Sequence, residues 1–296
     1  MEAYLVAVGV IALIYMLLAI GLNLQYGYTG LVNFGHVAFF AIGSYTSALL
    51  SLNGWSLAIT FIVAMLLAAL VAYPIGLLSL RLSDDYLAVV TLGFSETVRL
   101  VLQQEEWLTR GVQGLPGIPR LFQSLGVGQY ADIATFATLI VCNAIAIGLI
   151  THLVRSPYGR LIQAVRDDEI AVETLGKDPA RLKVQVFMLG AALAGLAGLM
   201  AGPIYAVQPG MGELILIQVF VVIVIGGIGS IRGALVGAII VGVVDTLGRA
   251  FLKPFLATLI SPTAAEAAGP ALASMLIYLL IAVVLAVKPA GLFQSR

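Results

Sequence analysis

Residues 56–80 read SLAITFIVAMLLAALVAYPIGLLSL and contain no charged side chain, which is typical of a helix that crosses a membrane. This segment ends a much longer uncharged stretch, since no Asp, Glu, Lys or Arg occurs between Glu2 and Arg81. At roughly 20 residues per crossing, that stretch is long enough for about three transmembrane helices. A soluble core cannot bury so much apolar helix, so the sequence predicts an all-α, polytopic integral membrane protein.

The amino-acid composition supports this class. The chain is 61% hydrophobic and 10% charged, with a mean hydropathy of +1.07, whereas soluble domains are about 25% charged. The net charge is zero, and no basic patch is large enough to indicate nucleic-acid binding. Cys142 is the single cysteine, which excludes a disulfide framework and a paired-cysteine metal site. The N-terminus lacks a basic region, so we expect the first apolar segment to be a retained helix.

Apolar segments recur along the chain and predict one transmembrane domain, residues 1–296, with about eight to ten spans. The second segment is irregular, because it combines several glycines with Asn33 and His36. Such a composition suits a broken or re-entrant helix that is buried in protein or lines a water-filled cavity. The spans are predicted at residues 4–24, 31–52, 56–80, 86–102, 131–154, 184–207, 213–231, 233–252 and 271–288.

Basic residues determine the predicted orientation. Many of them gather at residues 155–183, and the positive-inside rule places this loop in the cytoplasm. Counting the spans outward puts the N-terminus and an external loop, residues 103–130, outside and the C-terminus inside. Arg81, Arg232, Lys288 and Arg296 then also lie inside, whereas Arg110, Arg120 and Lys253 form an outside minority.

The cytoplasmic loop contains its own helix-capping signals. Ser156–Pro157 is a cap followed by proline at the first helical position, and the acidic run 167–169 suits the start of a second helix. Gly176 is a suitable C-cap, and Asp178–Pro179 starts the next span in the same way as Ser156–Pro157. These signals predict two short amphipathic helices that form a docking element. The alternative is a solvated connector that merely obeys the positive-inside rule.

Five motifs resemble the branched-chain amino-acid ABC-importer permease family, and they occur in that family's order across nearly the whole chain. The first motif favours the M-type subunit of that family, because the H-type subunit usually has a different sequence at this place. The motifs are GLNLQYGYTGLVNFGHVAFFAIGSYTSALL (21–50), YLAVVTLGFSETVR (86–99), TRGVQGLPGIP (109–119), SPYGRLIQAVRDDEIAVETLGKDPARLK (156–183) and VIVIGGIGSIRGALVGAII (222–240).

The resemblance implies an ABC-importer permease architecture in the bacterial cytoplasmic (inner) membrane. Its expected partners are an H-type permease subunit, two ATP-binding cassette ATPases that bind the ATP, an extracytoplasmic solute-binding protein and the lipid bilayer. The external loop, with Trp107 as an anchor, would meet the solute-binding protein. The loop at 155–183 would receive force from the ATPases, with Gly159 allowing close approach and Arg160 and Glu169 pairing across the interface. The implied ATPase-coupling residues are Tyr158, Gly159, Arg160, Ala164, Arg166, Glu169 and Gly176.

Two glycine-containing segments were considered as nucleotide sites. LGKDP is not a phosphate loop, because Asp178 replaces the Ser or Thr and the earlier glycine is missing. GGIGSIRG is not a dinucleotide motif, because Arg232 occupies the place of the third glycine. We therefore expect no ATPase site, no enzymatic activity and no cofactor in this chain. Instead, the spacing of small residues predicts close helix packing at Gly190, Gly198, Gly202, Gly229, Gly233 and Gly237.

Ionisable side chains inside the spans are functional candidates, since they are costly in lipid. Glu96 and Arg99 lie three residues apart, and Asp245 and Arg249 lie four apart, so each pair can form an ion pair on one helix. We favour structural pairs over direct substrate contact. The resemblance keeps Glu96 a candidate, since the family's motif has a Glu there.

The densest polar cluster lies in the first spans and includes Gln25. His36 either lines the pathway or is a histidine satisfied by neighbouring helices, and the sequence does not separate the two. A metal site is disfavoured, because the other histidine, His152, lies on a distant span. The pathway candidates are Asn23, Asn33, His36, Phe39, Phe40 and Glu96.

Three functions are alternatives to a branched-chain amino-acid permease. A permease for urea or short amides would have a similar sequence. A proton-coupled secondary transporter would use Glu96 or Asp245, but it would not need a docking loop. A membrane-embedded enzyme lacks support, because no metal cluster or nucleophile–base set is recognisable. The exact substrate and the pairing of permease subunits are left open.

Overall fold

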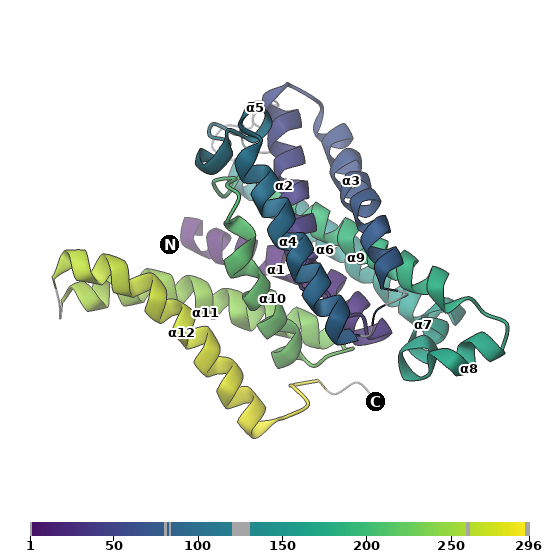
Figure 1. Cartoon of the computed structure of the whole chain (residues 1–296). Coiled ribbons are helices and arrows are strands. Elements are labelled where there is room, and N and C mark those ends of the chain that lie inside the picture. Colours follow the sequence, from purple (N-terminus) through teal and green to yellow (C-terminus); the bar gives the residue numbers. More distant parts are fainter. Residues whose placement is uncertain (1, 80–81, 83, 120–130, 259–260, 294–296) are drawn as a thin grey trace.

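The computed structural model describes residues 2–79, 82, 84–119, 131–258 and 261–293, and within them the regular structure is helical (Figure 1). The all-α prediction is confirmed. The elements are α1 (Glu2–Thr29), α2 (His36–Leu52), α3 (Leu57–Leu78), α4 (Asp84–Gln104), α5 (Glu106–Thr109), the 3₁₀ helix η1 (Gly111–Gln113), α6 (Ala131–Arg155), α7 (Pro157–Asp167), α8 (Glu169–Thr174), α9 (Pro179–Ala201), α10 (Met211–Gly226), α11 (Ile231–Ala257) and α12 (Pro262–Val287).

Each predicted span falls on one of these helices. Within the described residues, five helices are long and apolar enough to cross a membrane, namely α1, α3, α6, α9 and α11. Three shorter apolar helices match three further spans: α2, α10 and the segment Ala271–Val287 of α12. The remaining span corresponds to α4, which includes Glu96 and Arg99 and is therefore less apolar. The chain is a polytopic membrane protein.

The second span is broken, as its composition predicts. Helix α1 ends at Thr29, Gly30 adopts a left-handed φ of 80°, and α2 begins only at His36. The backbone between the two helices is held by protein groups, since the Phe34 N–H donates to the Thr91 hydroxyl at 3.0 Å. The irregular segment is therefore buried in protein, which is one of the two situations that allow such backbone at membrane depth.

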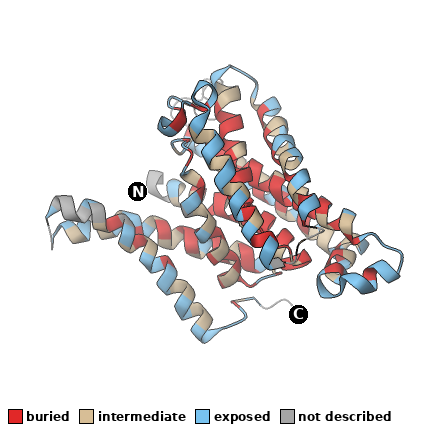
Figure 2. Cartoon of the chain, in the orientation of Figure 1, coloured by how far each residue is buried: buried red, intermediate tan, exposed pale blue. Residues whose placement is uncertain are grey.

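Helices α1 and α9 form the centre of the bundle. In their most apolar windows, 67% of α1 and 78% of α9 are buried, against 22% of α3 (Figure 2). Helix α9 packs against α2 and α3, and α1 packs against α6, α9 and α11. The outer faces of α3 and α6 are exposed and apolar, as expected for surfaces that meet lipid.

The small residues of α9 allow its close approach to neighbouring helices. A Cβ built at Gly198 would clash with the Phe40 carbonyl oxygen of α2, and the Ser44 hydroxyl donates to the Gly198 carbonyl at 2.7 Å. Gly190 packs against the Gln25 side chain in the same way. Gly202 ends the helix, and a Cβ there would lie 3.3 Å from the Ser44 carbonyl oxygen.

The later glycine series requires a correction. Gly229 is not part of a helix stripe, because it lies in the turn between α10 and α11 with φ of 80°. Its backbone N–H donates to the Asn23 side-chain oxygen at 2.8 Å. Gly233 and Gly237 do lie on α11, where they allow its backbone to approach the α10 carbonyls of Gly226 and Val222.

Segments predicted on the same side of the membrane contact each other. On the predicted cytoplasmic side, the Arg166 guanidinium donates to the Gly27 carbonyl at 2.8 Å, and the Phe293 N–H donates to the Gly226 carbonyl at 2.9 Å. On the predicted outer side, the Leu115 N–H donates to the Val207 carbonyl at 2.9 Å. Arg81, Arg120, Arg296, the Lys253 side chain and residues 120–130 of the external loop lie outside the described residues.

Candidate functional site

The cytoplasmic loop folds into the two predicted helices, α7 and α8. The Ser156 hydroxyl accepts from the Gly159 N–H at 3.3 Å, with Pro157 at the start of α7. Asp168 caps α8 and Asp178 caps α9 by the same type of bond. After α8, Gly176 adopts a left-handed φ of 73° and turns the chain towards α9. The capping signals in the sequence therefore define this element.

The element is braced against α9. The Lys183 ammonium pairs with the Glu169 carboxylate at 2.5 Å, and the Tyr158 hydroxyl donates to the Gln185 side-chain oxygen at 3.1 Å. Burial raises the pKa of the Tyr158 phenol above its usual value. Glu169 is thus paired within the chain to Lys183, and the pairing of Arg160 and Glu169 across an interface stays a prediction. Arg160 itself is exposed.

The tip of the element is exposed and partly apolar. The Ile170 and Leu175 side chains are 73% and 79% exposed, and Ala164 is exposed on α7. By contrast, Ile162 and Val165 are buried beneath the helices. Two large apolar side chains that point away from the protein in a charged loop are suited to contact a partner.

Buried hydrogen bonds hold the predicted polar cluster. The Gln25 amide donates to the Phe187 carbonyl at 2.8 Å, and its oxygen accepts from the Asn33 amide at 2.9 Å. The two ring nitrogens of His36 lie 3.1 Å from the Leu18 carbonyl and 3.2 Å from the Gln25 oxygen. A neutral imidazole donates to one of these two oxygens, so α1 supplies a hydrogen-bond partner for the ring, in keeping with the alternative in which neighbouring helices satisfy the histidine.

The structure places most pathway candidates inside the chain rather than at a cavity. Asn23, Asn33, His36, Phe39 and Phe40 are all at most 1% exposed. Phe39 makes an edge contact with the Phe187 ring, and Asn23 accepts a bond from the turn before α11. That these residues line a transport pathway remains a prediction.

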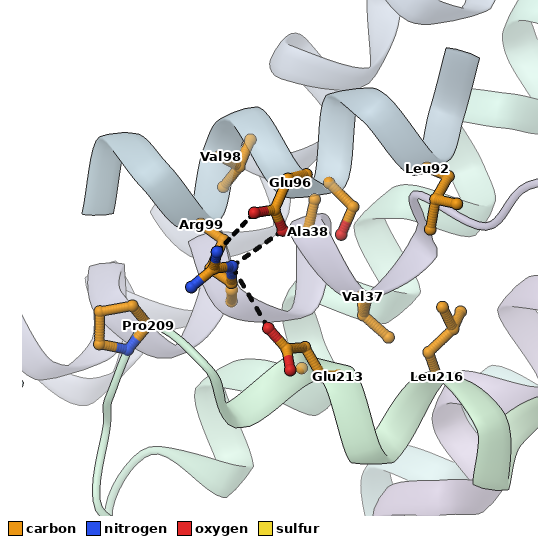
Figure 3. A pocket seen from close by; sticks show the side chains of 12 residues that line it. Val37, Ala38, Leu92, Glu96, Val98, Arg99, Pro209, Glu213 and Leu216 are labelled. Atoms are coloured by element: carbon orange, nitrogen blue, oxygen red, sulfur yellow. Dashed lines mark hydrogen bonds and ion pairs between the residues drawn. The ribbon is translucent and has the colours of Figure 1, made fainter. Parts of the chain in front are cut away.

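Glu96 lies at a cavity of about 320 Å³ between α2, α4 and α10 (Figure 3). The Arg99 guanidinium pairs with Glu96 through two contacts of 2.5 and 2.8 Å, so the predicted ion pair is present. The same guanidinium also lies 3.3 Å from a carboxylate oxygen of Glu213 in α10. Glu213 occupies the first turn of α10, where the helix dipole favours a negative charge.

The carboxylate of the second predicted pair is buried. The Asp245 carboxylate accepts from Arg249 at 2.7 Å and from the Tyr15 hydroxyl at 3.0 Å, and Tyr15 also contacts the Gln218 side-chain oxygen. Asp245 is 3% exposed, whereas the Arg249 side chain is 41% exposed. This network joins α1, α10 and α11, which supports the structural interpretation of the pair.

Residues 4–285 match the model of the family described as the branched-chain amino acid transport system / permease component. The chain belongs to this family. The resemblance inferred from the five motifs is confirmed.

Several relatives are similar to this permease over most of its length. It is 34% identical over 278 residues to the high-affinity branched-chain amino acid transport system permease protein LivM of Escherichia coli, covering 83% of this chain and 64% of that protein. The corresponding LivH protein of Escherichia coli is 31% identical over 256 residues, with 81% and 83% covered. A probable LivH of Methanocaldococcus jannaschii is 27% identical, with 78% and 76% covered. The permease thus spans about two thirds of the LivM length, and no solved structure matches it.

Two features of the permease were not predicted from the sequence. Glu213 joins Arg99 although the two residues lie on helices far apart along the chain, so no local spacing marks the contact. The exposure of Ile170 and Leu175 was also missed. A usable signal existed there, because both are large apolar residues in a short, highly charged segment.

Gly159 has a packing role that the sequence did not predict. It is buried, and a Cβ there would clash with the Val154 carbonyl oxygen at the corner between α6 and α7. Its lack of a side chain therefore serves packing within the chain, and the close approach of a partner at this position stays a prediction.

The substitution Gly159→Ala is expected to destabilise the permease by about 1–3 kcal/mol, because backbone must move to admit the methyl group. The measurement is the temperature at which half of the detergent-solubilised chain no longer elutes as a monodisperse peak in size-exclusion chromatography. Gly148→Ala on α6 is the control, since nothing lies within 4 Å of a Cβ there. Equal midpoints for the two variants would contradict the packing role.

Proposed function

We propose that this permease is the transmembrane subunit of a bacterial ABC importer for branched-chain or related amino acids. It lies in the cytoplasmic membrane and moves its substrate inward by alternating access. It pairs with an H-type permease subunit and receives substrate from an extracytoplasmic solute-binding protein. Two partner ATPases bind the ATP, so this chain has no ATPase site, enzymatic activity or cofactor of its own.

The observation that carries this proposal is the α7–α8 element. Its caps and its bonds to α9 make it a rigid extension of the transmembrane bundle. Arg166 joins it to the end of α1 through the Gly27 carbonyl. A push on the exposed tip is therefore transmitted to both central helices, α1 and α9. A simple connector would not need such bracing.

The proton-coupled alternative is less well supported. It needs a carboxylate that exchanges protons with the pathway, but Asp245 is buried in an ion pair with Arg249. Glu96 is held by Arg99 through two hydrogen bonds. A permease for urea or short amides agrees with the same architecture, and competition for uptake by urea and acetamide against L-leucine distinguishes the two substrates.

The docking role is tested with Ile170→Asp/Leu175→Asp. This double variant is expected to reduce co-purification of the ATPase and uptake of L-leucine at least about tenfold, since a well-packed apolar contact contributes about 2 kcal/mol. Both side chains are exposed, so the amount of permease in the membrane fraction should not change.

Ile170→Val/Leu175→Met is the matched control, because it keeps both positions apolar. It is expected to retain the ATPase and most of the uptake. If the aspartate variant binds the ATPase and imports leucine as well as the parent chain, the α7–α8 tip is not the docking surface and the proposal loses its main support.

A further inference from the structure

The cavity between α2, α4 and α10 has two chemically different ends. Glu96, Arg99 and Glu213 gather at one end, while Leu92 and Leu216 lie at the other (Figure 3). Its volume of about 320 Å³ is at the lower limit for small-molecule sites, which suits a ligand of a few carbon atoms. The remaining lining on α2 is also apolar, namely Val37, Ala38 and Ala41.

The charged end contains one cation between two carboxylates. Arg99 holds Glu96 by two short contacts, but Glu213 by one contact of 3.3 Å. The Glu213 and Glu96 side chains are 66% and 50% exposed. An exposed, single-contact ion pair contributes little stability, so the link from Arg99 to Glu213 is easily opened.

We propose that this cavity binds the zwitterionic head group of the transported amino acid, with its aliphatic side chain against the apolar end. The substrate carboxylate replaces Glu213 on the Arg99 guanidinium, and the released Glu213 carboxylate accepts from the substrate ammonium group. The inference rests on the proposed function and names the substrate-contacting residues for it.

Charge balance makes a zwitterion the fitting ligand. One ion pair between Arg99 and Glu213 is exchanged for two, while Arg99 keeps Glu96 as well, so each carboxylate has a cationic partner and the net charge of the site does not change. An anion would leave Glu213 unpaired, while a cation would meet Arg99 at the same place. Urea and short amides carry no charge, so they would form no new ion pair with Arg99 or Glu213 in exchange for the one they open. The apolar end favours an aliphatic side chain, since burying it there removes apolar surface from water.

The exchange of ion pairs also links substrate binding to the contact between α4 and α10. Arg99 joins α4 to α10 directly through its contact with Glu213. With substrate present, the same two helices are joined through the ligand, so their separation depends on whether the site is occupied.

The experiment uses the complete importer in lipid nanodiscs and photo-leucine, a diazirine analogue of leucine, as the probe. Labelled peptides are identified by mass spectrometry with and without excess L-leucine. Labelling is expected within residues 37–41, 92–99 or 209–216. Glu213→Gln is expected to raise the concentration for half-maximal labelling about tenfold or more, because a charged hydrogen-bond partner is lost.

Glu213→Asp is the matched variant, since it keeps the carboxylate and should restore most of the labelling. Leucinamide and 4-methylpentanoate, which each lack one charge of the zwitterion, should compete much less well than L-leucine. Leucine-sensitive labelling that maps elsewhere, or that Glu213→Gln leaves unchanged, would overturn the site.

Uptake by the parent complex separates this inference from the proposed function. If the parent importer takes up L-leucine while labelling maps to another cavity, the function stands and the site fails. If urea is taken up and L-leucine is not, the substrate class fails, and the zwitterion site fails with it.

Discussion

Replacing Gly198 with leucine is expected to destabilise the permease by about 3 kcal/mol, the upper end of the usual cost of forcing a larger side chain into a packed interior. At this position the Cβ alone would clash with the Phe40 carbonyl oxygen, so backbone must separate. The hydrogen bond from the Ser44 hydroxyl to the Gly198 carbonyl would be lost as well. Helix α9 is the most buried of the membrane-length helices described, so its displacement affects the whole bundle.

The stability of this variant is measured as the fraction of solubilised chain that stays monodisperse during heating. Gly148→Leu is the matched control, because Gly148 is exposed on α6 with open space around it. Leucine is a better helix former than glycine by about 1 kcal/mol, so the control should be neutral or slightly stabilising. A similar loss in both variants would show that lipid exposure, not packing against α2, explains the effect.

The Gly198 result also bears on where the small-residue stripe acts. Small-residue stripes in membrane helices can join two subunits or two helices of one chain. The sequence does not distinguish these cases, because the spacing of small residues identifies one face of the helix but not the helix that packs against that face. In the structure the neighbour is α2 of the same chain. The defect should therefore already appear in the isolated permease.

Local features of the fold were predictable because their causes are local. The interruption before α2 follows from glycines beside Asn33 and His36, and the caps of α7, α8 and α9 follow from Ser or Asp before a helix. The Glu96 and Arg99 pair follows from a spacing of three residues on one helix. Each depends on residues only a few positions apart.

Contacts between distant segments were not predictable in this way. Glu169 pairs with Lys183, a contact that no local spacing predicts, because the turn at Gly176 folds α8 back towards α9. Glu213 reaches Arg99 only because α10 packs beside α2 and α4. Such contacts depend on helix crossing angles and on loop geometry, which hydrophobic periodicity does not specify.

Removing the cation of the buried Asp245 pair is expected to have the second large effect. Arg249→Leu leaves a carboxylate that is 3% exposed without its counter-charge, and loss of one partner from a buried pair costs about 3–5 kcal/mol. Asp245→Asn should cost less, because the Arg249 side chain is 41% exposed and the Tyr15 hydroxyl still has an oxygen to bond. Thermal midpoints of the solubilised chain measure both.

The double variant Asp245→Asn/Arg249→Leu separates charge from packing. If the cost of Arg249→Leu arises from an uncompensated carboxylate, neutralising Asp245 should recover most of the lost stability. A double variant as unstable as Arg249→Leu alone would show instead that the arginine stem contributes through its packing against neighbouring helices.

The same Asp245→Asn variant tests the proton-coupled alternative through transport. A carboxylate that carries protons must be able to ionise, and asparagine cannot, so a proton-coupled transporter that used Asp245 would lose uptake completely. A structural ion pair predicts otherwise: the asparagine variant, once folded, should import L-leucine at a rate close to that of the parent complex. Uptake is therefore compared per molecule of folded permease, so that loss of stability is not mistaken for loss of transport. Retained uptake would assign Asp245 to the packing of α1, α10 and α11, whereas abolished uptake in a stably folded complex would give the buried carboxylate a direct part in the transport cycle.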